Sequence, residues 1–217
     1  MRKTRWFIAG LLSAALIPAG ASAQRTREFE DSWFWGAKAG VATFSPTFGK
    51  SETAATYGAE WLITRTHGAL YISVDETNMS SLSAVFDPSA DGGFRPVQVD
   101  KMRRLGFAAL AFPKRFGRFR PYAGLGLTVN VVGSADPLVA AADDELDEIV
   151  FDRIDERKSQ AAFLGMAGVQ AQYHRAAFFV QASVAPASSR FLLSDSSLGW
   201  FEAGVRYNFS GAREGIR

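Results

Sequence analysis

Histidine and cysteine, the residues most often used for catalysis and metal binding, are scarce in this chain. It contains two histidines, His67 and His174, and no cysteine. Imidazole commonly activates a serine nucleophile, and thiolates are common zinc ligands, so these counts restrict both kinds of site. Each histidine lies in a short polar segment, and no His-x-Ser sequence occurs. We interpret both as solvent-exposed turn residues and expect no catalytic residue, no cofactor and no metal site.

The one dense group of possible metal ligands is acidic. Between positions 143 and 156 the chain carries Asp143, Asp144, Glu145, Asp147, Glu148, Asp152, Asp155 and Glu156. Apolar residues recur there at helical spacing after Asp136-Pro137, which would suit an N-cap and a first helical turn (Leu138, Ala142, Leu146, Ile149 and Val150). The spacing does not match an EF-hand loop. We predict a short amphipathic helix with a solvated acidic face, and binding of Ca²⁺ or Mg²⁺ stays an open alternative.

The N-terminus has the pattern of an export signal. Arg2, Lys3 and Arg5 precede an apolar stretch from 6 to 20, and Ala21-Ser22-Ala23 forms a small-x-small cleavage site. We predict a signal peptide over 1–23, followed by a polar leader over 24–32. Its removal would leave 21 basic against 22 acidic residues, a net charge of −1. Such a balance does not favour nucleic-acid binding.

Strict alternation of apolar residues with small or polar ones dominates the rest of the chain. This period of two indicates β-strands with two different faces. Six segments show it clearly, namely 35–42, 57–64, 70–75, 122–131, 178–184 and 201–209. Two weaker segments, 103–112 and 161–173, have apolar residues on both faces and complete a set of eight predicted strands. Gly124 and Gly126 then face a crowded interior and do not form a phosphate-binding loop.

The predicted connections alternate in length. Short connections at 65–68, 113–117 and 174–176 alternate along the chain with long ones at 45–53, 77–96, 133–157 and 186–197. In an up-and-down meander all long connections fall at one end, as they do in outer-membrane barrels. The sequence therefore predicts one all-β domain over 33–209, an eight-stranded antiparallel transmembrane β-barrel with long extracellular loops and short periplasmic turns, followed by a short tail over 210–217.

The contents of the two strand faces favour a membrane barrel over a soluble, lipocalin-like periplasmic barrel. The apolar face of the clear strands carries no charge, whereas the other face is mostly small and polar with a few ions, as expected of a narrow interior. Aromatic residues near the predicted strand ends fit interfacial girdles. These are Trp33, Trp35, Tyr57, Trp61, Tyr122, Tyr173 and Tyr207.

Four of the ions on the small, polar face fall on strands that would be neighbours in a closed barrel. Lys38, Glu60, Glu202 and Arg206 would then point into one small space. Isolated charges in a dry interior cost several kcal/mol each, so we predict that these four neutralise one another and plug the lumen. A water-filled path lined by the same charges is the alternative.

Two segments carry a resemblance to a known family. The last strand, with Glu202, Gly204, Tyr207 and Phe209 in the spacing polar-x-Gly-x-x-hydrophobic-x-aromatic, resembles the C-terminal β-signal of bacterial outer-membrane proteins. The stretch 120–126, Arg-Pro-Tyr-Ala-Gly-Leu-Gly, is similar to one recurrent in small barrels of the outer-membrane protein A, X and W type. The resemblance implies location in the outer membrane of a Gram-negative bacterium and insertion by the barrel assembly machinery with periplasmic chaperones.

These observations lead to one functional expectation and two alternatives. We expect a non-enzymatic outer-membrane barrel with a side-chain-filled lumen and a structural or surface-interaction role, in contact with outer-membrane lipids and lipopolysaccharide, with no nucleic-acid partner and with an unknown surface partner. A narrow channel or carrier for small or hydrophobic solutes is the first alternative. A lipid A-modifying enzyme, which would need a His near a Ser at the outer leaflet, is the second.

Overall fold

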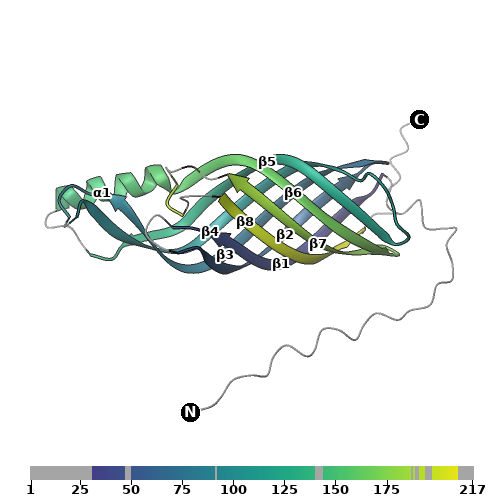
Figure 1. Ribbon diagram of the computed structural model, residues 1–217, viewed down its shortest axis with the longest axis horizontal. Helices are drawn as coiled ribbons and strands as arrows, with labels where there is room; N and C mark the ends of the chain where they lie inside the picture. The colour runs from purple at the N-terminus through teal and green to yellow at the C-terminus, as the bar shows by residue number, and fades with distance from the viewer. Residues whose placement is uncertain are drawn as a thin grey trace, which may run out of the picture.

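The computed structural model describes residues 31–46, 50–90, 92–139, 144–186, 188, 191–193 and 197–209. Eight antiparallel strands form a closed barrel in chain order (Figure 1), which confirms the predicted fold class. The strands are β1 (Trp33–Phe44), β2 (Glu52–Thr64), β3 (Gly68–Phe86), β4 (Phe94–Ala111), β5 (Phe119–Pro137), β6 (Ser159–Tyr173), β7 (Ala176–Pro186) and β8 (Ser197–Tyr207). The described residues also form one helix, α1 (Asp144–Arg157). The predicted signal peptide, nearly all of the predicted leader and the tail over 210–217 lie outside the described residues.

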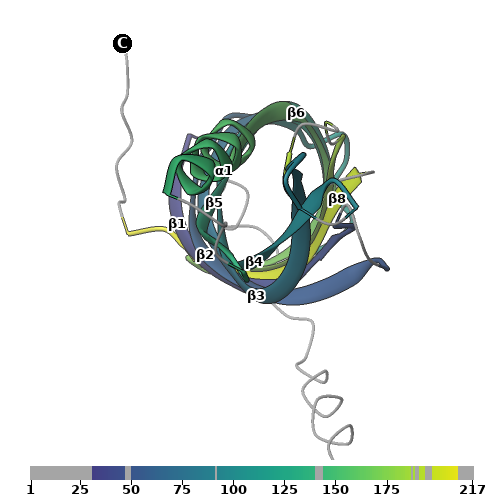
Figure 2. The same ribbon diagram turned by 90° about the vertical axis from the view of Figure 1, so that its left-hand side faces the viewer.

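Closure of the barrel follows from pairing of the first and last strands. In the β1–β8 ladder Lys38 lies opposite Gly204 and Gly40 lies opposite Glu202, so no edge remains along this seam. The view along the long axis shows the ring of strands (Figure 2). The two weaker predicted strands, 103–112 and 161–173, lie within β4 and β6 and are confirmed except at Phe112, which follows β4.

The two faces of each strand are separated as the alternation predicts. Outward residues include Leu125 and Phe163, which are 77% and 75% exposed, whereas inward residues such as Thr128 and Asn130 are fully buried. Outward positions from Ala123 to Val131 on β5 are all apolar. At about 3.3 Å per residue and a tilt of about 40° they span about 20 Å, close to the ~25 Å apolar band of outer-membrane barrels.

The connections divide between the two ends of the barrel (Figure 1). The turns 65–67, 112–118 and 174–175 lie at one end, here named the turn end, and the other four connections lie at the opposite loop end. His67 and His174 are both exposed in these turns, His174 with a left-handed φ of 53°. Among the described residues no helix is long and apolar enough to cross a membrane.

Two of the four predicted long loops, 77–96 and 133–157, are wrong in extent, because three strands continue past the rim, whereas 45–53 and 186–197 agree closely with the connections observed. β3 and β4 pair as far as Phe86 and Phe94, so most of the predicted loop 77–96 is a hairpin, and β5 continues beside β4 to Pro137. We name this projection, β3 from Met79, β4 up to Lys101, β5 from Gly133 and α1, the tower. Its Ser-rich β3 segment lacks a clear apolar alternation, and cross-strand pairing with β4 decides its conformation.

Helix α1 is confirmed as an element with Val150 on its buried face, but its start and the position of Ile149 differ from the prediction. It begins at Asp144, so Asp136-Pro137 ends β5 and is no N-cap, and Leu138 precedes the helix. Val150 and Ile154 are the residues that pack into the tower, against Val85, Val97 and Leu192. Ile149 is 43% exposed, and the side chains of Ala142 and Leu146 lie outside the described residues. The buried face therefore contains the predicted Val150 and continues one turn further, to Ile154.

An aspartate orders the turn at the tip of the tower. Asp87 Oδ1 accepts hydrogen bonds from the Ser89 backbone N–H at 2.9 Å and from the Ser89 hydroxyl at 2.6 Å, and Asp87 Oδ2 accepts one from Arg95 Nε at 2.6 Å. The bonds from Ser89, supported by the positive charge of Arg95, lower the pKa of Asp87 from 3.8 to about 2.

Because this pKa is lowered in the folded turn, the carboxylate stabilises the turn above about pH 4, and the contribution is lost as the pH falls through about 2. We expect the Ser89 amide resonance, followed by NMR in detergent micelles, to shift with a midpoint near 2. In Asp87→Asn this titration should be absent. A Ser89 titration centred on the ordinary value of 3.8 would contradict the assigned hydrogen bonds.

Glycine is required where neighbouring strands approach closely inside the barrel. A Cβ on Gly126 would collide with the Phe107 carbonyl oxygen and lie 2.6 Å from the Ala108 Cα on β4, whereas a Cβ on Gly199 would meet no heavy atom within 4 Å. We expect Gly126→Ala to lower the free energy of unfolding by about 1–3 kcal/mol, measured by urea denaturation of the refolded barrel. Gly199→Ala is the matched control, and equal effects of the two substitutions would refute the packing argument.

Candidate functional site in the barrel lumen

Three basic and three acidic side chains meet inside the barrel. Each is at most 4% exposed, and together they carry no net charge. They come from β1, β2, β3, β4 and β8, and they are Lys38, Glu60, Asp75, Arg104, Glu202 and Arg206. We call these six residues the lumen network.

Four members of the lumen network form one group. Lys38 Nζ lies 2.9 Å from Asp75 Oδ1 and 3.1 Å from Glu202 Oε1. Arg104 Nη2 lies 2.7 Å from Asp75 Oδ2 and 2.6 Å from Glu202 Oε1. Each acid therefore contacts both bases. A buried charge needs this kind of multiple pairing to offset the loss of its hydration.

The other two members, Arg206 and Glu60, form a second group. Arg206 Nε donates to Glu60 Oε1, and Arg206 Nη1 donates to Gln170 Oε1 at 2.7 Å. The guanidinium also lies over the Phe179 ring, 3.9 Å from its centroid. Arg206 is fully buried, so these contacts replace water around its charge.

Neutral polar side chains connect the two groups. Gln181 Nε2 donates to Glu202 Oε2 at 3.0 Å and to the Tyr71 hydroxyl at 3.1 Å, and Tyr71 in turn accepts a bond from Lys38 Nζ at 2.8 Å. Gln181 Oε1 accepts the Tyr122 hydroxyl at 3.0 Å and lies 3.3 Å from Arg206 Nη2. One glutamine thus holds both groups in a single network.

Two of the ion pairs, Arg206–Glu60 and Lys38–Asp75, cross an intervening strand over a glycine. Gly36 on β1 lies opposite Glu60 on β2 and opposite Arg206 on β8, so these two side chains meet above it. Gly58 on β2 is similarly placed between Lys38 on β1 and Asp75 on β3. A Cβ on Gly36 would lie 2.9 Å from Glu60 Cγ and 3.1 Å from Arg206 Cγ. The absence of a side chain on the middle strand makes room for each pair.

Apolar clusters close the lumen on both sides of the network. On the turn side Phe34, Leu62, Leu110, Phe112 and Met166 pack with Tyr71 and Tyr122. On the loop side the cluster contains Phe44, Val99, Met102, Phe191, Leu193, Leu198 and Trp200. Arg104 contacts this second cluster, because its guanidinium lies 4.2 Å from the Trp200 ring centroid. The ions are therefore enclosed between two apolar layers.

The ion pairs of the lumen network hold different strands together. Its acids and bases are paired with one another, and in the described part of the chain no group of three or more His, Asp or Glu residues could hold a metal ion. Asp147, one of the acids considered as a cation ligand, instead lies 3.8 Å from Arg95 Nη1. Both histidines lie at the turn end, away from these groups.

All four residues predicted for the charge cluster point into the lumen, but they separate into the two groups described above. The prediction omitted Asp75 and Arg104. Asp75 alternates with the apolar residues of segment 70–75, so the sequence already places it on the inward face. Arg104 is obscured because both faces of segment 103–112 contain apolar residues. The alternation of Arg104, Gly106 and Ala108 with Leu105 and Phe107 is the signal that could have identified it.

Five of the seven predicted girdle aromatics have exposed rings, and Tyr122 does not. At the turn end the partly buried Trp61 stacks on Trp35, with ring centroids 5.4 Å apart, and meets Trp33 edge to face at 5.5 Å. Tyr57 is exposed and donates to Glu76 Oε1 at 3.0 Å. Tyr173 and Tyr207 are exposed at the turn end. Tyr122 is 3% exposed inside the barrel, so its assignment to a girdle is wrong. Its neighbours Ala123 and Leu125 take the outward face, and the alternation turns it inward.

The four residues that resemble a β-signal point in different directions. Glu202 and Gly204 lie on the inward face of β8, Tyr207 lies on its outward face, and Phe209 follows the strand. Glu202 joins the lumen network, and a Cβ on Gly204 would lie 2.9 Å from Lys38 Cβ. Tyr207 and Phe209 point outward with ring centroids 4.8 Å apart. The segment therefore contributes to the interior as well as to the outer surface.

Comparisons with known proteins agree with this geometry. No family model and no curated protein match the sequence. Among solved structures, Neisserial surface protein A (NspA) aligns at a TM-score of 0.57 and 15% identity, over 82% of this chain and 97% of that chain. Ail of Yersinia pestis (TM-score 0.49, 12% identity, 83% and 99% coverage) and the N-terminal barrel domain of Pseudomonas aeruginosa OprF (0.48, 12%, 83% and 98%) are also found.

The alignment with NspA, together with the closed eight-stranded meander, defines the class. The chain has the fold of the small bacterial outer-membrane β-barrels.

The lumen network makes a prediction that two adjacent arginines can test. Arg104 is buried between Asp75 and Glu202, whereas Arg103 points outward and forms an exposed pair with Glu76 at 3.2 Å. We expect Arg104→Gln to lower the free energy of unfolding by about 3–5 kcal/mol, because it leaves a buried acid incompletely paired. Arg103→Gln should leave the urea midpoint close to that of the wild type. If both substitutions had the same small effect, the lumen network would not stabilise the barrel.

Proposed function

We propose that this protein is a non-enzymatic outer-membrane barrel of a Gram-negative bacterium, with a closed lumen and a structural or surface-interaction role. The observation that carries the proposal is the neutral lumen network enclosed between two apolar clusters. A path for ions would need hydrated charges and a continuous polar wall, and here the charges are buried and paired. The outward apolar face of the strands supports residence in a bilayer.

A narrow channel or a carrier remains the competing function. It would require the ion pairs to separate and both apolar clusters to open, and breaking buried pairs costs several kcal/mol. The exported barrel would reach the membrane through its β-signal and the barrel assembly machinery, as the residues Gly204, Tyr207 and Phe209 suggest.

Conductance distinguishes a closed barrel from a channel. We expect the refolded protein in a planar bilayer to show no steady openings under conditions in which a general porin conducts, because no hydrated path crosses the apolar clusters. Insertion must be shown in the same sample by heat-modifiable gel migration. Reproducible unitary openings of the inserted, folded protein would contradict the closed lumen.

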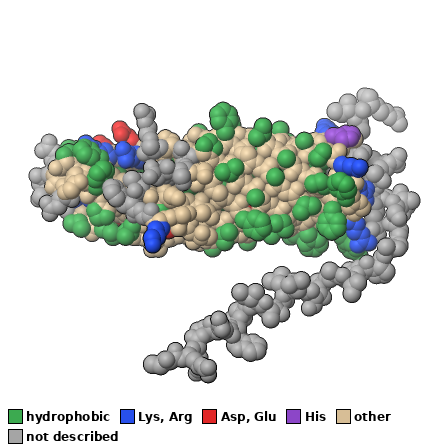
Figure 3. Space-filling view, in the orientation of Figure 1, with side chains coloured by type: hydrophobic (Ala, Val, Ile, Leu, Met, Phe, Trp, Pro, Cys, Tyr) green, Lys and Arg blue, Asp and Glu red, His purple; other side chains and the backbone are tan. Residues whose placement is uncertain are grey.

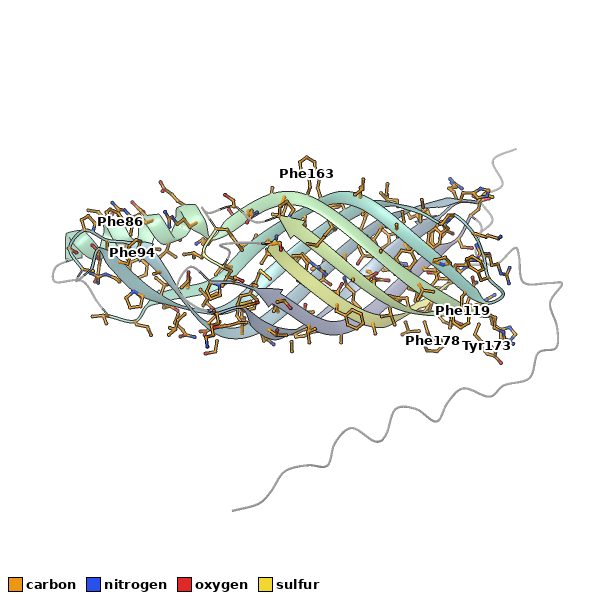
Figure 4. All side chains as sticks on the ribbon, viewed as in Figure 1. Phe86, Phe94, Phe119, Phe163, Tyr173 and Phe178 are labelled. Atoms are coloured by element: carbon orange, nitrogen blue, oxygen red, sulfur yellow. The ribbon has the colours of Figure 1, made fainter. Side chains whose placement is uncertain are left out.

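The tower supports a surface-interaction role. Its tip carries Phe86 and Phe94, whose rings lie 5.9 Å apart and which are 47% and 44% exposed (Figure 4). Arg153 of α1 donates a hydrogen bond to the Phe86 carbonyl oxygen. Two apolar residues close to Arg153 in the sequence of α1, Ile149 and Phe151, are also exposed. Exposed apolar residues on an ordered projection are typical of interaction surfaces. They lie beyond the rim, where membrane lipid would not cover them.

Single cysteines test both location and orientation, because the chain has no cysteine of its own. With the tower outside the cell, Phe94→Cys should react with a membrane-impermeant maleimide on intact cells. Arg115→Cys, at the turn end, should react only after the outer membrane is permeabilised. Labelling of Arg115→Cys alone on intact cells would show the opposite orientation, and labelling of neither before permeabilisation would contradict a surface location.

A lipid A-modifying activity has less support. It needs a His beside a Ser near the outer leaflet, and in the proposed orientation both His67 and His174 lie at the periplasmic end. Mass spectrometry of lipid A from cells with and without the protein should show the same acyl chains.

A further inference from the structure

The two ends of the barrel carry different charges. The turn end presents basic side chains on three separate turns, namely Arg65, Lys114, Arg115, Arg118 and Arg175 (Figure 3). Among the described residues there, Asp31 is the one exposed acid, and it pairs with Arg65 at 2.6 Å. The tower at the other end is rich in exposed acids on α1. We infer that the turn end binds the anionic headgroups of phospholipids in the adjacent leaflet.

The basic residues lie directly beside the outward aromatic residues. Phe119, Tyr173 and Phe178 lie near one another at the turn end (Figure 4), and they are 57%, 43% and 59% exposed. The Arg118 guanidinium is 5.9 Å from the Tyr173 ring centroid, and Lys114 Nζ is 5.6 Å from that of Phe116. Aromatic rings mark the interface between acyl chains and headgroups. The neighbouring charges therefore fall at the depth of the phosphates.

These charges are available to a ligand. Within the described residues no carboxylate lies within ion-pair distance of Lys114, Arg115, Arg118 or Arg175. Long basic side chains can lay their methylene groups along an apolar surface and direct the charged group to the headgroups. A phosphodiester supplies the acceptor oxygens that guanidinium and ammonium groups bind.

The distribution of the charges favours a lipid surface over a single bound anion. The basic residues sit on the β2–β3, β4–β5 and β6–β7 connections, which are spaced around the rim of the ring, and no described acid or cavity gathers them into one pocket. A ring of lipid headgroups can contact all three turns at once, whereas one free phosphate can contact only one. The inference rests on the proposed membrane location, and it adds the lipid class.

The test compares lipids that stay bound to the refolded protein. Detergent micelles would contain equal amounts of phosphatidylglycerol and phosphatidylcholine. Native mass spectrometry would then count the molecules of each lipid bound to the intact barrel. We expect the ratio of bound phosphatidylglycerol to bound phosphatidylcholine to be several-fold above that of the micelle. A basic residue that contacts a headgroup should favour the anionic lipid there by roughly fivefold. Added NaCl should reduce the enrichment, because salt screens exposed charges.

A fourfold variant, Lys114→Gln, Arg115→Gln, Arg118→Gln and Arg175→Gln, should bring the ratio of bound lipids to that of the micelle. Lys101→Gln with Arg103→Gln, outside the turn end, is the matched control and should keep the enrichment. Equal binding of both lipids by the wild type, or an unchanged ratio in the fourfold variant, would overturn the inference. Displacement of phosphatidylglycerol by inorganic phosphate at constant ionic strength would overturn it too, in favour of a free-anion site.

Failure of this inference is distinguishable from failure of the proposed function. A folded, non-conducting barrel that retains both lipids equally would keep the proposed function and lose the lipid preference. A protein that retains neither lipid and does not insert into bilayers would contradict membrane residence itself. Heat-modifiable migration of every variant shows whether the barrel has folded before the lipids are counted.

Discussion

Side chains fill the interior of this eight-stranded barrel, and the six ions of the lumen network are at most 4% exposed, so each must be paired with other side chains to offset its lost hydration. The rest of the structure is arranged around this constraint. Lys38, Asp75, Arg104 and Glu202 pair in one group, Arg206 pairs with Glu60, and Gln181 connects them. Apolar clusters on both sides exclude water, which strengthens the pairs and raises the cost of separating them. A closed lumen is the direct consequence.

Pairing between alternate strands depends on glycine and on register. Gly36 and Gly58 lie under the two crossings, and a shift of one residue in either ladder would turn the ions outward into the apolar surface. The same register places Leu125 and Phe163 outward. Charge neutralisation inside and apolar exposure outside are therefore two results of one pairing scheme, and closure by β1 and β8 joins them.

Outside the lumen, two groups of exposed charges lie at opposite ends of the barrel axis. Basic residues border the apolar surface at the turn end, and exposed acids lie on α1 in the tower. The tower is an ordered continuation of the barrel wall, because β3, β4 and β5 keep their pairing past the rim and α1 covers Val85 and Val97. The barrel thus offers two different surfaces, one beside the membrane and one projecting beyond it.

The alternation of residue types predicts six of the strands, their inward and outward faces, and the inward direction of Lys38, Glu60, Glu202 and Arg206, because a strand has a period of two wherever one face differs from the other. The other two strands and the closed meander follow from the need for strand partners and from the alternating lengths of the connections. The sequence pattern could not predict the tower, since Ser-rich strands become stable only through partners distant in sequence. Alternation turns Arg104 and Tyr122 inward, but it could not show which partners they meet there, Asp75 and Glu202 for Arg104 and Gln181 for Tyr122. Which charges meet depends on strand register, and register is decided by cross-strand packing over the whole closed ring, information that no local pattern carries.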